Sequence, residues 1–232
     1  MAVSTSVKRL RRAAAGLLLS AALSLSAALT AAAAGPGELV QREAVLQQYA
    51  AQPAVHQLVL VKQVQGSDAL VDYYVKAEDG SWNLQFETDG LLGGNGIGKL
   101  KEGDCNTPFG DYGISGAFGL AEDPGTKLSY IPVKDTTYAC DEPGPYYDRI
   151  IDTAETGHDC RGESMAACRL EYRYGIVIDY NPAHIYPRGS AIFLHCKGEN
   201  PATHGCIAID EARMVEILRT ADPGLRIVIG VY

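Results

Sequence analysis

The chain has 232 residues, of which 47% are hydrophobic and 21% charged, a globular composition that excludes collagen-like and wholly disordered proteins. It carries 20 Lys and Arg against 28 Asp and Glu, a formal net charge of −8. No basic run follows the first dozen residues, so nucleic acid is excluded as a partner.

The N-terminal segment has the pattern of a secretory signal peptide. Four basic residues within positions 8–12 precede the apolar stretch Ala13–Leu29, and a small-residue tract then ends at Ala34. This order predicts a signal peptide over residues 1–34, with export to the cell wall, the extracellular space or the periplasm. A retained membrane anchor is the alternative, because the stretch is nearly long enough to cross a bilayer. Residues 1–34 hold four basic and no acidic residues, so cleavage leaves a net charge of −12 and no stable membrane span.

The following elements are mostly strands. Residues 38–51 predict a short amphipathic helix, and residues 35–55 form a lead-in to a single domain over residues 56–232. Strands are predicted at residues 58–64, 70–77, 82–88, 174–180, 191–195, 206–209 and 225–231, the first three as a meander. One late helix begins after Asp210 and ends before Asp222. This order predicts a mainly β fold of the β-sandwich or barrel-like kind.

The segment of residues 132–169 has little regular pattern and is predicted to be a long, ordered, lid-like loop beside a functional site. In an exported protein, some cysteines are expected to pair. We predict a disulfide between Cys140 and Cys160 that brackets this loop, with Cys105 or Cys168 as possible replacements for either partner.

Residues 190–209 hold the groups that cysteine-dependent acyl transfer requires. His195 ends one apolar strand, and Cys206 begins the next. Cys206 is the candidate nucleophile, and His195 reaches it if the two strands are neighbours. His204 lies two residues before Cys206 and shares its face on an extended chain. Gly205 lets the backbone approach a substrate carbonyl, so its N–H and that of Cys206 are candidate oxyanion donors.

The same stretch resembles the catalytic domain of L,D-transpeptidases. Residues 203–207, Thr-His-Gly-Cys-Ile, match the family's motif, and His195 falls at its upstream histidine. A second block over residues 98–110 resembles the family's G-D-x-x-T-P-x-G turn, so the resemblance covers about residues 58–231. Three features depart from it: the short spacing between His195 and His204, Ala208 where the family commonly has Arg, and Cys196 where it has Gly.

The resemblance implies cell-wall chemistry on donor and acceptor peptidoglycan stem peptides, with no cofactor and no metal. Cys206 would attack the amide after the third stem residue, release D-alanine and form a thioester that an amine resolves into a 3→3 cross-link. His195 would be the base, with His204 as the second choice. The candidates for oxyanion or substrate contacts are Gly205, Thr203, Tyr186 and Arg188.

Two other functions remain open. A hydrolase of the same fold, an L,D-carboxypeptidase or a murein amidase, shares the acyl-enzyme step. A zinc-binding module would use His195, Cys196, His204 and Cys206, with His158 and Cys160 nearby. The spacing matches none of the common zinc patterns, and Cys196 should point away from His195 on a strand, toward packing or a disulfide.

Overall fold

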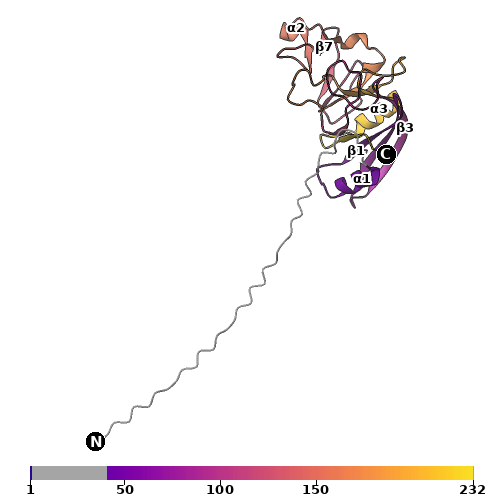
Figure 1. Ribbon diagram of the computed structural model, residues 1–232, viewed down its shortest axis with the longest axis vertical. Helices are drawn as coiled ribbons and strands as arrows, with labels where there is room; N and C mark the ends of the chain where they lie inside the picture. The colour runs from indigo at the N-terminus through magenta and orange to yellow at the C-terminus, as the bar shows by residue number, and fades with distance from the viewer. Residues whose placement is uncertain (2–40, 232) are drawn as a thin grey trace. The chain divides into compact units, whose positions relative to one another are not determined.

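The computed structural model describes residue 1 and residues 41–231, and the predicted signal peptide lies outside this part (Figure 1). The strands are β1 (Gln57–Gln65), β2 (Asp68–Lys76), β3 (Trp82–Leu91), β4 (Gly110–Tyr112), β5 (Ile114–Gly119), β6 (Tyr130–Pro132), β7 (Thr137–Cys140), β8 (Arg149–Asp152), β9 (Glu163–Ser164), β10 (Gly175–Ile178), β11 (Phe193–Cys196), β12 (Ile207–Ile209) and β13 (Arg226–Ile229). The helices are α1 (Arg42–Ala50), α2 (Thr153–Thr156), α3 (Glu211–Thr220) and the 3₁₀ turns η1 (Met165–Ala167) and η2 (Glu171–Arg173).

A large curled sheet organises the domain, as the mainly β prediction requires. Its strand order is β4-β13-β1-β2-β3-β12-β11-β10-β5-β6. The predicted meander is confirmed, because β1, β2 and β3 pair in sequence as antiparallel neighbours. Near the middle of the sheet, β11 and β12 pair in parallel, with His195 opposite Ala208. The two segments that hold the candidate catalytic residues are therefore direct neighbours.

The large sheet has apolar residues on both faces, and a helix packs on each face. In β1, Val59 and Val61 pack into the core under α3, whereas Leu58 and Leu60 pack on the other face with α1. Alternate residues of a strand face opposite sides, so a strand that is apolar throughout needs cover on both. The predicted late helix is confirmed as α3, which buries Met214, Ile217 and Leu218. Asp210 is its N-cap residue, but its side chain pairs with Lys197.

The segment of residues 132–169 is not an irregular loop, and this part of the prediction is wrong. It contains a three-stranded antiparallel sheet in the order β8-β7-β9, followed by η1. Figure 1 shows β7 and α2 at the end of the domain away from α1. The predicted disulfide is confirmed: Cys140 at the end of β7 is bonded to Cys160, with 6.0 Å between their Cα atoms.

The lead-in helix is confirmed as α1, with Val45 and Tyr49 buried against β1 and β2. It is shorter than predicted in the described region, because it begins at Arg42. In the described part of the chain, no helix has both the length and the apolar character to cross a bilayer.

Candidate active site

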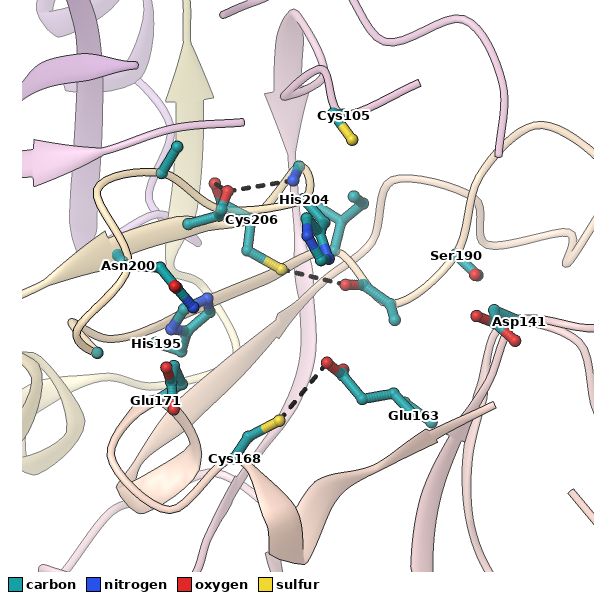
Figure 2. A pocket seen from close by; sticks show the side chains of 18 of the residues that line it. Cys105, Asp141, Glu163, Cys168, Glu171, Ser190, His195, Asn200, His204 and Cys206 are labelled. Atoms are coloured by element: carbon teal, nitrogen blue, oxygen red, sulfur yellow. Dashed lines mark hydrogen bonds between the residues drawn. The ribbon is translucent and has the colours of Figure 1, made fainter. Parts of the chain in front are cut away.

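The Cys206 thiol is held by backbone groups of the neighbouring segment. Cys206 directly precedes β12, and it shares a sheet face with His195 because His195 lies opposite Ala208, which is two residues after Cys206. The thiol donates to the Ala191 carbonyl oxygen over 3.2 Å, and the Phe193 N–H donates to the sulfur over 3.3 Å. Figure 2 shows the first of these bonds. The thiol is thus held in place by backbone groups of residues 191 and 193.

The His195 ring is oriented as a proton acceptor. Its Nδ1 lies 2.7 Å from the Cys196 carbonyl oxygen, which only accepts hydrogen bonds, so Nδ1 carries the proton in the neutral ring. Nε2 is then unprotonated and free to take a proton from a thiol. The Tyr172 ring packs edge-on against the imidazole, with 5.6 Å between ring centroids. His195 is buried, with 5% of its surface exposed.

Burial keeps both groups neutral at rest. It raises the pKa of the Cys206 thiol to about 12, an effect opposed by the Phe193 N–H and the positive charge of Lys99. It also lowers the pKa of His195, although the bond to Cys196 and the charge of Glu171 act in the opposite direction. The resting pair is therefore thiol and imidazole.

The turn before Cys206 differs in detail from the prediction. His204 is exposed and lines the same pocket as His195 and Cys206. The Gly205 N–H donates to Thr203 Oγ1 over 3.1 Å, so it is already engaged. Thr203 Oγ1 in turn donates to the Cys206 carbonyl oxygen over 2.8 Å. Within residues 41–231, the Cys206 N–H donates to no other group, which leaves it available to a substrate oxygen.

The glycine at position 205 is required by the local geometry. Its φ of +144° is a conformation that side chains rarely adopt. A Cβ there would lie 2.9 Å from the Asn106 carbonyl oxygen and 3.3 Å from Ile192 Cδ1. The turn that presents Cys206 therefore packs directly on the second motif block.

The second motif block, residues 98–110, supports the turn before Cys206 through hydrogen bonds. Thr107 is fully buried; its hydroxyl accepts from the Gly93 N–H over 2.8 Å and donates to the Cys206 carbonyl oxygen over 3.3 Å. Asp104 pairs with the buried Lys99 over 3.0 Å and accepts from the N–H of Leu100, Lys101 and Asn106. Burial alone would raise the pKa of Asp104, but these donors lower it to about 2.

The pocket around Cys206 has a volume of about 360 Å³, and its walls include residues that sequence reasoning missed. Glu163 comes from β9 and accepts from the Tyr172 hydroxyl and the Cys168 thiol. Glu171 also lines the pocket, as does Asp141, which follows β7. No sequence signal identifies these residues, because the small sheet that brings Glu163 and Asp141 to the site was not predicted.

Two candidate substrate contacts lie elsewhere. Tyr186 and Arg188 are exposed and do not line the pocket, and the Tyr186 ring packs edge-on against Tyr147 at 5.2 Å. They were selected only because they lie just upstream of the predicted strand at residues 191–195.

The zinc alternative loses two of its ligands. Cys160 is in the disulfide, and Cys196 packs in the core on the face of the sheet opposite His195. In the region that the structure describes, no three His, Cys, Asp or Glu residues are arranged to hold a metal ion. The predicted packing role of Cys196 is confirmed.

Comparison with known proteins identifies the family. The family model of the L,D-transpeptidase catalytic domain matches residues 86–229. Among solved structures, the chain is similar to a mutant of Enterococcus faecium L,D-transpeptidase, at 15% identity and a TM-score of 0.36 over 75% of this chain and 49% of that one. It is also similar to the Ldtfm-avibactam carbamoyl enzyme, at 16% identity and a TM-score of 0.35 over 76% of this chain and 48% of that one.

This chain spans about half the length of those two solved chains. A search of curated proteins finds no match. The family model covers more than half of the chain and includes both motif blocks, so the chain belongs to the L,D-transpeptidase catalytic domain family.

Proposed function

We propose that this protein is an exported cysteine acyltransferase that cross-links peptidoglycan stem peptides through a thioester on Cys206. The observation that carries the proposal is the placement of His195 on β11 and of Cys206 directly before the adjacent parallel strand β12, in one pocket. A nucleophile and a base with a free Nε2 are what thiol acylation requires.

The first half-reaction forms the acyl-enzyme. The Cys206 proton moves to His195 Nε2, and the sulfur attacks the amide carbonyl carbon after the third residue of the donor stem. The C–N bond then breaks, the proton on His195 passes to the departing amine of D-alanine, and a thioester remains on Cys206. In the second half-reaction an acceptor amine attacks the thioester, His195 takes its proton, and that proton returns to the sulfur as the new amide leaves.

The oxyanion of each tetrahedral intermediate needs N–H donors. The unengaged Cys206 N–H supports its role as the first donor. The Gly205 N–H becomes the second only if the Thr203 hydroxyl releases it, which gives Thr203 a part in the site. His204 is exposed and lines the same pocket, which supports a contact with a substrate carboxylate.

Export is supported by the chemistry of the described cysteines. The Cys140–Cys160 disulfide would persist in an oxidising compartment and would be rare in the cytosol. N-terminal sequencing of protein recovered from the producing cells tests this part. A mature chain that starts near Gly35 is expected, and an intact Met1 would contradict cleavage.

Purified disaccharide-tetrapeptide tests the activity. The wild-type enzyme should give a dimer with loss of D-alanine, and Cys206→Ser should give none. Cys196→Ala is the matched control, since Cys196 lies one strand away on the opposite face and should leave the products unchanged. Tripeptide without dimer would assign a hydrolase, and unchanged substrate with folded wild-type protein would refute both activities.

A further inference from the structure

We propose that Glu171 is a positioning residue that stabilises the protonated form of His195. Its role in turnover rests on the proposed function, but its effect on the Cys206–His195 pair does not need a peptidoglycan substrate. The resemblance to the family identified a base without an acidic partner, and no motif pointed to position 171.

The chain that carries Glu171 is packed against the histidine. Glu171 begins η2, and the next residue, Tyr172, places its ring edge-on against the imidazole, at an interplanar angle of 87°. The same segment leads into β10, which pairs with β11 so that Gly175 lies opposite His195. Glu171 and His195 line one pocket, and Figure 2 shows the carboxylate beside the ring.

The backbone at Gly198 leaves room for the Glu171 carboxylate. Gly198 follows His195 by three residues, and a Cβ at this position would overlap Glu171 Oε1, Cδ and Cγ. Only glycine leaves room for the side chain in its present place. Among the hydrogen bonds and ion pairs of the described residues, none involves the Glu171 side chain, and the nearby Arg173 pairs with Glu211 instead.

The negative charge of Glu171 matters most once the thiolate no longer balances the imidazolium of His195. The Nδ1–H bond to the Cys196 carbonyl contributes a dipole but no net charge. The thiolate balances the imidazolium at first, but on attack the negative charge passes from the sulfur to the oxygen of the tetrahedral intermediate. A nearby carboxylate then holds the proton on His195 until the leaving amine accepts it.

The other titratable groups around the imidazole do not supply this charge. The other carboxylates that line the pocket are Glu102, Asp141 and Glu163. Glu163 already accepts from Tyr172 and Cys168, and Glu102 accepts from Tyr147 and Ser190. The segments packed over the ring and the turn before β12 present the following titratable groups to the site: Glu163, Cys168, Tyr172, His204 and Cys206. Burial raises the pKa of the Cys168 thiol to about 12 and raises that of Tyr172, so both are neutral.

The test measures alkylation of Cys206 by iodoacetamide, a neutral probe, in the full mature protein. Peptide mass spectrometry separates Cys206 from the other free thiols, and rates are taken between about pH 5 and 9. Glu171→Gln removes the charge and retains the shape. We expect the Cys206 rate near neutral pH, where thiol and imidazole are the resting forms, to fall about tenfold, because loss of the carboxylate charge lowers the pKa of the histidine by about one unit and reduces the thiolate–imidazolium population accordingly.

Two further variants keep the test decisive. Glu171→Asp should restore most of the rate near neutral pH, and Gly198→Ala, which displaces the carboxylate, should reproduce the loss. Glu199→Gln is the matched control, because Glu199 is exposed and does not line the pocket. Its profile should match that of the wild type.

Superimposable profiles for wild type and Glu171→Gln would overturn the proposal. An unchanged alkylation profile with a raised KM for the stem peptide would also overturn it and would assign Glu171 to substrate binding. If the wild type makes no dimer or tripeptide but the alkylation profile shifts, the proposed function fails and this inference stands.

Discussion

Loss of the Cys140–Cys160 disulfide is expected to lower the free energy of unfolding by about 3 kcal/mol. The two cysteines are 20 residues apart in the sequence, and both are buried. Closing a loop of this length removes about 3 kcal/mol of conformational freedom from the unfolded chain at 25 °C. The double variant Cys140→Ala/Cys160→Ala lacks this constraint, and for a chain of this size the melting temperature should fall by about 6–12 °C.

The same variant should weaken substrate binding, because the disulfide lies beside the pocket. Ala139 and Asp141, on either side of Cys140, line it, and Glu163 on β9 pairs with β7. Differential scanning calorimetry of the oxidised protein measures the first effect, and the KM for the tetrapeptide measures the second. Cys105→Ala, which removes a free thiol, is the stability control. A double variant that melts within about 2 °C of this control would refute the loop-closure reasoning.

Three other changes probe the turn that carries Cys206. Gly205→Ala introduces a Cβ 2.9 Å from the Asn106 carbonyl oxygen at a φ of +144°, so urea unfolding should show a loss of about 2 kcal/mol, and wild-type stability would contradict the geometry. Thr107→Val leaves a buried backbone N–H without its acceptor and should cost about 1–3 kcal/mol and slow acylation of Cys206; an unaltered acylation rate would argue against support of the turn. Because the folded-state pKa of Asp104 is lowered to about 2, its stabilisation is present above about pH 4 and is lost toward about pH 2. Acid titration should therefore show a steeper loss for the wild type than for Asp104→Asn, and parallel curves would be inconsistent with the hydrogen bonds to Asp104.

Much of the strand content could be predicted from local pattern. The first meander shows it, because β1, β2 and β3 have apolar and aromatic runs separated by turn residues. The parallel pairing of β1 with β13 could not be predicted from the same signal, since a pairing between strands far apart in sequence leaves no periodicity in either. The small sheet was missed because β7, β8 and β9 are two to four residues long, too short for alternation to register.

The candidate site likewise has residues that the sequence predicts and residues that it does not. Cys206, His195, His204 and Gly205 lie in one short stretch, so motif spacing alone placed them together. Residues that reach the pocket through tertiary packing, such as Glu171, carry no local mark. The prediction that both N–H groups of the turn are free also depended on the hydroxyl rotamer of Thr203, which no sequence pattern specifies.

The sulfur of Cys206 is held by the carbonyl of Ala191 and the N–H of Phe193, which are backbone groups. Substitution of either side chain leaves those partners in place as long as the strand keeps its path. The nucleophile's resting geometry is therefore encoded by chain direction and not by residue identity at these positions. Libraries that vary residues 191 and 193 to change what the pocket admits should retain a correctly placed thiol, whereas a one-residue insertion between them should abolish it.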